Sequence, residues 1–224
     1  MARAGCVHAL VVVAALTAAS AGATDRWQVA ERNDDEREGY VLYVSESEHA
    51  GKLRYKIETR LEATPEDAVA GILLAMTSPR FIPERQQREI LAESPEEILV
   101  YTYIDMPMIV SDREVALRIY RRTDENTGVQ RIYWETANEA LEAPAKNVVR
   151  IPSVEGYWEF EPDGPGRSRA TYVTYSDVGG SLPAWLTEPM MRDQITGDVQ
   201  RLRDVIQTLP REVSAEPPRL PAGG

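Results

Sequence analysis

Cysteine and histidine are scarce in this chain of 224 residues, which holds one cysteine and two histidines. Cys6 and His8 lie within the first 23 residues, and His49 lies in SESEHAGK, a segment with the composition of an exposed turn. The remainder therefore has no disulfide, no thiol nucleophile and no cysteine ligand for a metal. One turn histidine and scattered carboxylates do not make a metal site, so we expect neither a metal nor another cofactor.

Phosphate-binding motifs and excess positive charge are also missing. Neither GxGxxG nor a phosphate-binding Gly-Lys loop occurs, so no nucleotide site is indicated. The net charge is -11, and it becomes about -12 if Arg3 is removed with a leader. This charge argues against nucleic acid as a partner and against electrostatic docking on anionic lipid.

The first residues, MARAGCVHALVVVAALTAASAGA, have the pattern of a secretory signal peptide. Arg3 precedes an apolar run over 9–19, and Ala21-Gly22-Ala23 supplies small residues for cleavage. We predict residues 1–23 as a signal peptide cut after Ala23, and a periplasmic or secreted mature protein. The alternative is that the segment stays as an anchor, although its apolar run is short for a membrane span.

The remaining chain is predicted to be one domain, residues 24–209, that folds on its apolar core. It is followed by PREVSAEPPRLPAGG, in which four prolines disfavour helix and sheet. We predict residues 210–224 to be a disordered tail.

Alternation and turn residues predict a sheet that is interrupted by one helix. Three strands are expected at 27–32, 40–47 and 52–61, and then a helix that Thr64 caps and Pro65 opens. Between residues 84 and 177 we expect four or five more antiparallel strands, with turns at 93–96, 124–128 and 163–166.

The last predicted element is a long amphipathic helix that begins near Leu182 and ends before Pro210. Its apolar stripe is Ile195, Val199, Leu202, Ile206 and Leu209. Burial of this stripe against the sheet gives an α+β fold, and incomplete closure between a cylinder and a bent sheet leaves a pocket.

Two strands offer candidate pocket residues. The even positions of a strand over 148–160 form an apolar face with Trp158, interrupted by Arg150. Arg150 either pairs with an acid such as Glu135 or Asp177, or anchors a ligand. On the strand over 98–104, Tyr101 and Tyr103 share one face and either brace the core or orient a ligand head group.

Three segments together resemble a known family: YTYIDMPMIVSDREV, NVVRIPSVEGYWEFEP and TYVTYSDVGGSLPAWL. In content, order and spacing they are similar to the START (steroidogenic-acute-regulatory-protein-related lipid transfer) domain, over about 180 residues. The resemblance implies a helix-grip fold, in which a curved antiparallel sheet around a long C-terminal helix encloses a hydrophobic tunnel for one lipid or other apolar molecule.

The resemblance also implies roles for particular residues. Arg113 falls where phospholipid-binding members contact the head-group phosphate, and Arg118 falls where some sterol-binding relatives place an arginine in the tunnel. Strand alternation argues against Arg118, because its neighbours on either side look like the core face. Two departures, Glu114 for the usual aspartate and Val178 for the usual proline, leave the ligand class open.

The candidate ligand-binding residues are therefore Arg113, Arg150, Arg118, Tyr101, Tyr103, Glu135, Trp158 and Trp185. The leading hypothesis is a non-enzymatic, monomeric carrier of a lipid or other hydrophobic small molecule, with transient membrane contact.

Two other functions are open. One is a cyclase or hydrolase of the same superfamily, with Glu135, Tyr101 and Arg150 as general acid, orienting group and oxyanion partner. The other is a protein-interaction module that uses the acidic surface or the proline-rich tail.

Gly179 and Gly180 directly precede the last helix, with Ser181 as its N-cap candidate and Pro183 in its first turn. Glycine adopts backbone angles that other residues avoid. The pair is expected to form a corner over the tunnel mouth, or alternatively a hinge that lets the helix lift.

Overall fold

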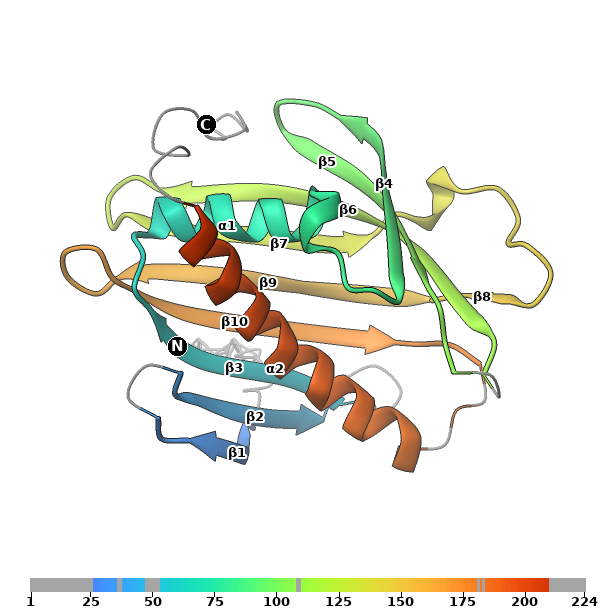
Figure 1. The fold of residues 1–224 in the computed structure, drawn as a ribbon, viewed down its shortest axis with the longest axis horizontal. Helices are drawn as coiled ribbons and strands as arrows, with labels where there is room; N and C mark the ends of the chain where they lie inside the picture. The colour runs from blue at the N-terminus through green and yellow to red at the C-terminus, as the bar shows by residue number, and fades with distance from the viewer. Residues whose placement is uncertain are drawn as a thin grey trace, which may run out of the picture.

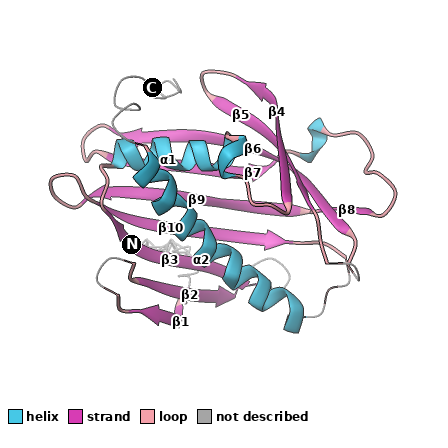
Figure 2. Ribbon diagram, viewed as in Figure 1, coloured by secondary structure: helices cyan, strands magenta, loops and turns pink. Residues whose placement is uncertain are grey.

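In the part of the chain that the structure describes, one sheet of ten strands and two α-helices make up the architecture (Figures 1 and 2). The structure is a computed structural model that describes residues 26–35, 38–46, 53–107, 110–180, 182 and 184–209. The predicted signal peptide, the predicted tail, His49, Ser181 and Pro183 lie outside the described residues. The strands are β1 (Gln28–Asn33), β2 (Tyr40–Glu46), β3 (Leu53–Leu61), β4 (Gln86–Glu93), β5 (Glu97–Ile104), β6 (Asp112–Asp124), β7 (Val129–Thr136), β8 (Val148–Arg150), β9 (Ser153–Pro162) and β10 (Ser168–Asp177).

The strands follow the order β1-β2-β3-β10-β9-β7-β6-β5-β4, and every neighbouring pair in that order is antiparallel. The short strand β8 lies off this path and pairs in parallel with the beginning of β6. The last hairpin, β9–β10, therefore connects two parts of the sheet. Its strand β10 pairs with β3 of the N-terminal strands, and its strand β9 pairs with β7 from the middle of the chain.

The sequence located the first three strands within one residue at each end, and all three predicted turns separate strands. The predicted number of later strands is wrong, because the described residues after residue 84 form seven strands rather than four or five. One reason is that the strand expected over 148–160 is two strands, β8 and β9. Pro152 has no N–H to give to a ladder, and the break falls at Ile151–Pro152.

Helix α1 (Pro65–Thr77) begins as predicted. The Thr64 hydroxyl accepts a hydrogen bond from the Asp67 N–H at 3.2 Å, which satisfies one of the free N–H groups of the first turn. Two 3-10 turns, η1 (Pro79–Phe81) and η2 (Asn138–Ala140), connect strands elsewhere.

Helix α2 (Ala184–Thr208) crosses the same face of the sheet as α1, as Figure 1 shows. The predicted stripe is confirmed, since Ile195, Val199 and Leu202 are at most 1% exposed. Val205, which the predicted stripe omitted, is also fully buried. The two helices pack at Gly71, where a Cβ atom would lie 3.0 Å from Ile206 Cγ1, so glycine permits the close approach.

The fold class predicted from the sequence is confirmed: a curved antiparallel sheet with the long C-terminal helix laid across it. Among the described residues, no helix combines the length and the apolar composition needed to cross a membrane.

Candidate functional site

A cavity of about 500 Å³ lies between α2 and the sheet. Its walls come from α1, the segment that leads into β4, the strands β4, β5, β6, β7, β9 and β10, and α2. Much of the wall is apolar, including Ile72, Ile104, Val115, Leu117, Val154 and Met191. Helix α2 thus covers a space that the core side chains do not fill.

Three aromatic side chains of neighbouring strands line the cavity together. Trp158 stacks on Tyr172 with ring centroids 4.5 Å apart, and Trp134 lies 5.5 Å from Tyr172. Because these rings pack on one another, they form a rigid apolar surface rather than separate flexible groups.

Arg113, on β6, is the most buried charged group of the cavity wall, with 3% exposure. Its guanidinium donates to the carbonyl oxygens of Val178 (3.5 Å), Gly179 (3.3 Å) and Ser111. It forms no ion pair with a carboxylate of any described residue. Burial lowers the pKa of Arg113, and the Asp112 carboxylate opposes that effect only in part.

A second polar group of residues lies where α2 faces β10. The Asp198 carboxylate accepts hydrogen bonds from Arg201 at 2.5 Å and from the Tyr172 hydroxyl at 3.1 Å. Burial raises the pKa of Asp198, although Arg201 counteracts this. Burial and the Asp198 charge also hold the pKa of Tyr172 well above its usual value.

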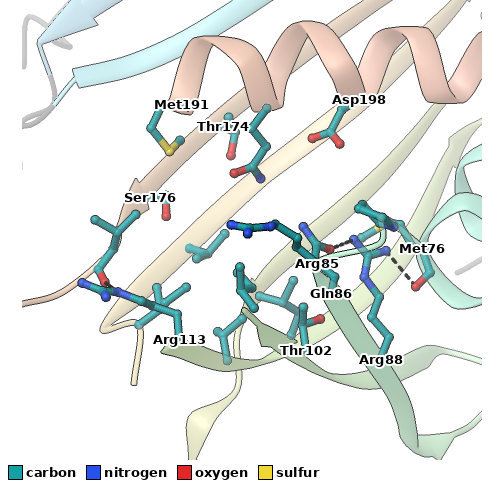
Figure 3. Close-up of a pocket in the computed structure, with 18 of the residues that line it drawn as sticks. Met76, Arg85, Gln86, Arg88, Thr102, Arg113, Thr174, Ser176, Met191 and Asp198 are labelled. Carbon is teal, nitrogen blue, oxygen red and sulfur yellow. Dashed lines mark hydrogen bonds between the residues drawn. The ribbon is translucent and has the colours of Figure 1, made fainter. Parts of the chain in front are cut away.

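Arg88, on β4, completes this region and connects it to α1. Its Nη1 donates to the carbonyl oxygens of Ala75 and Met76 at the end of α1, and its Nη2 donates to Gln86. Positive charge at a helix C-terminus is stabilising, so Arg88 anchors β4 to α1. Figure 3 shows the contacts of Arg88 with Gln86 and Met76, with Arg85 extending from the same segment into the cavity.

The two glycines before α2 form the corner that the sequence predicted. Both have positive φ, +68° for Gly179 and +71° for Gly180. A Cβ on Gly179 would lie 2.9 Å from Pro152 Cδ, and one on Gly180 would lie 3.3 Å from Arg113 Nη2. The corner therefore needs glycine both for its backbone angles and for the space beside Arg113.

Of the eight residues selected from the sequence, Arg113 and Trp158 line the cavity. The other six do not line it, and a ligand contact by any of them stays a prediction. Trp185 lies near the start of α2 with 73% of its surface exposed.

Strand alternation explains why four of these residues do not line the cavity, namely Tyr101, Tyr103, Arg118 and Glu135. Thr102 and Ile104 of β5 line the cavity, so Tyr101 and Tyr103 between and beside them point to the other face. Their hydroxyls donate to Glu114 and Asp112. Neither tyrosine therefore reaches the cavity.

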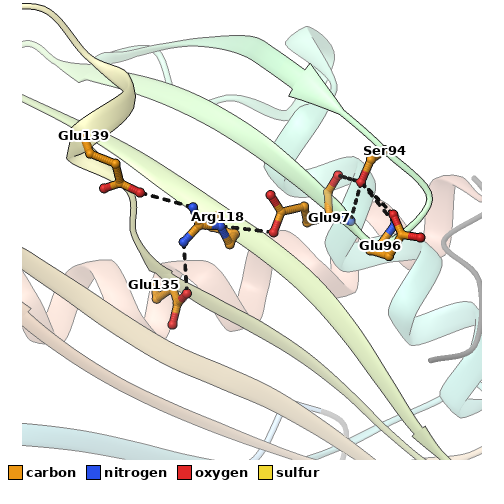
Figure 4. A network of polar contacts seen from close by, with 6 residues as sticks. All are labelled: Ser94, Glu96, Glu97, Arg118, Glu135 and Glu139. Atoms are coloured by element: carbon orange, nitrogen blue, oxygen red, sulfur yellow. Dashed lines mark hydrogen bonds and ion pairs between the residues drawn. The ribbon is translucent and has the colours of Figure 1, made fainter. Parts of the chain in front are cut away.

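Arg118 also lies on the outer face, because Arg113, Val115 and Leu117 occupy the inward positions of β6. Its guanidinium forms ion pairs with Glu97 (3.1 Å), Glu135 (3.3 Å) and Glu139 (3.1 Å), as Figure 4 shows. Glu135 is thus an ion-pair partner on that face. It lines a separate hollow of about 190 Å³ with several tyrosines.

Arg150 pairs with an acid, as one of the two interpretations held, but the acid is neither Glu135 nor Asp177. The parallel pairing of β8 with β6 brings Arg150 to Glu114, with Nη2 at 2.5 Å from the carboxylate. The enzymatic alternative required Glu135, Tyr101 and Arg150 to converge in the cavity, and they do not.

Sequence reasoning missed Arg85, Arg88, Tyr172 and Asp198 as cavity residues. Asp198 offered a signal, because it lies within the apolar stripe of α2, three residues after Ile195. An acid on a buried helix face needs a polar partner. Arg88 gave none, because QQREILAE of β4 is too polar to define an inner face, and Arg85 precedes that strand.

Comparison with known proteins gives a match to the START domain family model over residues 79–211. Uncharacterized protein PA1579 of Pseudomonas aeruginosa is 23% identical over 205 residues, covering 91% of this chain and 98% of that protein. Mouse phosphatidylcholine transfer protein is 23% identical over 154 residues, and the match covers 67% of this chain and 72% of the mouse protein.

Among solved structures, a STAR-related lipid transfer protein fragment from Xanthomonas axonopodis superposes with a TM-score of 0.69 at 26% identity. The match covers 82% of this chain and 99% of that fragment. Human STARD10 superposes with the same TM-score at 15% identity, covering 87% of this chain and 80% of that chain.

Proposed function

The chain belongs to the START domain family, and from this premise we propose that it binds one lipid or other hydrophobic small molecule in the cavity beneath α2 and carries it. The observation that carries the proposal is the cavity itself. Its volume of about 500 Å³ lies within the range of about 300–1,000 Å³ that is typical of small-molecule sites. The relatives named as lipid transfer proteins support the same function.

The carrier function can be tested by filling the cavity. Ala75 is 6% exposed and lines the cavity, so Ala75→Phe places a ring in the ligand space. Ala92→Phe on the exposed part of β4 is the matched control. We expect protein isolated from its own cells to release an apolar molecule on organic extraction, as seen by native mass spectrometry. Ala75→Phe should lose that molecule and Ala92→Phe should retain it; a wild-type protein that never holds an apolar molecule would contradict the proposal.

We propose that the protein acts as a binder rather than as an enzyme. The residues that a cyclase or hydrolase mechanism would have used lie outside the cavity, where they form ion pairs and hydrogen bonds. Incubation with a captured ligand should therefore return it chemically unchanged. A product of different mass would contradict this part of the proposal.

Export to the periplasm or the outside of the cell is a further part of the proposal. Its support is the sequence of residues 1–23, with its apolar run and small residues before Thr24. Cell fractionation and N-terminal sequencing would test it, with Thr24 expected as the first residue. A cytoplasmic protein that begins at Met1 would contradict it.

Ligand exchange is proposed to involve brief membrane contact near the start of α2, by a monomer. Trp185 is exposed there, and Met106 and Pro107 line the cavity. The Arg113 hydrogen bonds to Val178 and Gly179 hold the beginning of β6 beside the segment that precedes α2. Trp185→Ala should slow ligand transfer between vesicles while ligand affinity in solution is unchanged.

A further inference from the structure

A second hollow, of about 190 Å³, lies on the face of the sheet that is turned away from the two helices. Ile132 and Trp134 of β7 belong to the buried core, so Tyr133 and Glu135, which alternate with them, point to the opposite face. Both of these residues line the hollow, which we call the outer hollow. The sheet therefore separates it from the cavity beneath α2, and the carrier function gives it no role.

Three tyrosines form one wall of the outer hollow because strand register places them side by side. Tyr120 of β6 is the partner of Tyr133 of β7, and Tyr133 is the partner of Tyr157 of β9. The first two rings stack with centroids 5.3 Å apart, and the Tyr133 and Tyr157 rings are tilted with centroids 5.8 Å apart. Side chains that already pack on one another lose little freedom when a ligand binds. This wall is therefore a fixed aromatic surface, ready to accept a flat apolar face.

A second row of residues gives the outer hollow its charges. Glu135 of β7 and Glu155 of β9 are direct register partners, and like charges in such positions destabilise a sheet. Arg118 lies 3.3 Å from Glu135 and compensates it. Glu155 is exposed, and its carboxylate has no hydrogen-bond or ion-pair partner among the described residues. The fold gains nothing from this pairing, and arrangements that oppose stability are expected at functional sites.

The mixture of charges and rings restricts the kind of ligand that the outer hollow accepts. An anion would meet two carboxylates, and an organic cation would meet Arg54, which also lines the hollow, and the nearby Arg118. A wholly apolar molecule would take water away from Glu155 without replacing its hydrogen bonds. A neutral molecule with several hydroxyl groups avoids all three costs, because hydroxyls both donate to carboxylates and accept from a guanidinium.

We propose that the outer hollow binds one neutral sugar ring, whose C–H face lies on Tyr133 and Tyr157 and whose hydroxyls donate to Glu135 and Glu155. The volume lies below the range of about 300–1,000 Å³ for drug-sized ligands, which suits a single ring. A free monosaccharide and the terminal ring of a longer saccharide share this chemistry. The site is additional to the proposed carrier function and does not depend on it.

Saturation-transfer difference NMR at neutral pH tests the proposal with sugars of matched shape. The neutral probes are glucose, galactose, mannose and N-acetylglucosamine. Each is compared with the amino sugar and the uronic acid of the same ring, which are cationic and anionic. We expect at least one neutral sugar to bind about tenfold tighter than both charged counterparts. A disaccharide that ends in the favoured ring distinguishes the two sources: tighter binding indicates a longer saccharide, and equal binding indicates the free sugar.

Glu155→Ala locates the site because it removes an exposed acceptor. It should weaken the favoured sugar about tenfold. The melting temperature should be unchanged or higher, since the like-charge pairing is lost, and a merely structural residue would behave in the opposite way. Glu161→Ala, on the same face of β9 but outside the outer hollow, is the matched control and should leave sugar affinity unchanged.

Tyr120→Leu tests the aromatic wall separately. Leucine keeps an apolar side chain but removes the flat ring, so the favoured sugar should again bind about tenfold more weakly. Tyr43→Leu, on β2 and outside the outer hollow, is the matched control.

Three results would overturn the proposal. The first is that none of the four neutral sugars binds. The second is that an amino sugar or a uronic acid binds tightest, because the outer hollow would then select an ion. The third is that Glu155→Ala binds the favoured sugar as tightly as the wild type does, because the sugar would then lie elsewhere. None of these results bears on the apolar molecule in the cavity beneath α2, which organic extraction detects independently.

Discussion

Gly156 lies opposite Trp134 in the pairing of β9 with β7, at a point where no side chain fits. A Cβ atom there would meet the carbonyl oxygen of Val173 and would lie 2.8 Å from Cε2 of the Trp134 indole. Trp134 in turn packs on Tyr172 in the cavity wall. The shape of the wall therefore depends on the absence of a single methyl group.

Gly156→Ala should destabilise the protein by about 1–3 kcal/mol, since the backbone and the indole must both shift. The melting temperature from circular dichroism should fall by roughly 2–4 °C per kcal/mol. Gly197→Ala is the matched control: its Cβ would meet nothing within 4 Å, and alanine favours a helix over glycine. It should raise the melting temperature, and equal losses in the two variants would contradict the steric argument.

Asp198 should make the folded protein less stable as pH rises, whereas an aspartate with a lowered pKa has the opposite effect. Burial raises its pKa in the folded state above the usual 3.8, so the folded protein binds a proton where the unfolded chain has released it. Stability from this group is therefore lost as pH rises from about 4 through the folded pKa. Relative to Asp198→Asn, the wild type should lose free energy of unfolding over that range.

Urea unfolding of both proteins at a series of pH values would measure the difference. The comparison with Asp198→Asn removes the contribution of Asp112 and Asp124, whose pKa values are lowered by hydrogen bonds and which act in the opposite direction. If the wild type instead became more stable relative to Asp198→Asn as pH rises, the attraction of Arg201 for the Asp198 carboxylate would exceed the cost of burying it.

Single residues show where sequence reasoning reached the site and where it stopped. Alternation along β6 correctly separated Arg113 from Arg118, because one regular strand keeps its parity. The same reasoning failed for Arg150, since parity does not continue across Pro152. Arg85 precedes β4 and has no strand to fix its direction, so only three-dimensional placement shows it in the cavity.

At the scale of elements, the corner between β10 and α2 determines how the helix lies over the sheet. Gly179 fits against Pro152 and the Arg150 carbonyl, and Gly180 fits against Arg113. The corner interpretation is thus supported by close packing. The hinge stays a prediction.

Alanine substitution should separate the roles of the two glycines. Gly179→Ala combines a positive φ with a close contact and should lower stability by more than about 1–2 kcal/mol. Gly180→Ala should cost less stability, because its Cβ would meet only the Arg113 guanidinium, at 3.3 Å. Gly166→Ala controls for backbone strain alone, because its φ is +67° and its Cβ would be free of contacts.

Thermal unfolding of the same three variants provides the measurement. The rate at which the bound apolar molecule leaves the cavity, measured by stopped flow, would also test the hinge. The hinge predicts slower release in Gly179→Ala. Identical losses of stability in Gly166→Ala and Gly179→Ala would mean that the contact with Pro152 contributes nothing.

Elements with strong local signals were the ones that the sequence located. Thr64 and Pro65 marked the start of α1, and the stripe of α2 gave its buried face. Strand β8 was merged with β9 in the prediction because three residues carry no periodicity of their own, and its parallel pairing with β6 arises only from tertiary contacts. The cavity followed from the fold class, but its polar lining did not.

At the scale of the whole molecule, the net charge of -11 should govern approach to membranes. Association with vesicles that contain anionic phospholipid should be weaker than with phosphatidylcholine vesicles at about 0.01 M salt. The difference should shrink at about 0.15 M, where the Debye length falls to about 8 Å. Emission from the exposed Trp185 provides the readout, with Trp185→Phe as control; stronger association with anionic vesicles at low salt would contradict the argument.

The strand order has a kinetic consequence. Strand β3 finds its second neighbour only in β10, and the ion pair between Arg60 and Asp163 spans 103 positions of the chain. Until the β9–β10 hairpin is synthesised, the first three strands and the middle strands remain two separate ribbons with open edges. Closure must therefore wait for nearly the complete polypeptide, and the long loop that it requires should make folding slow compared with helical proteins of similar size.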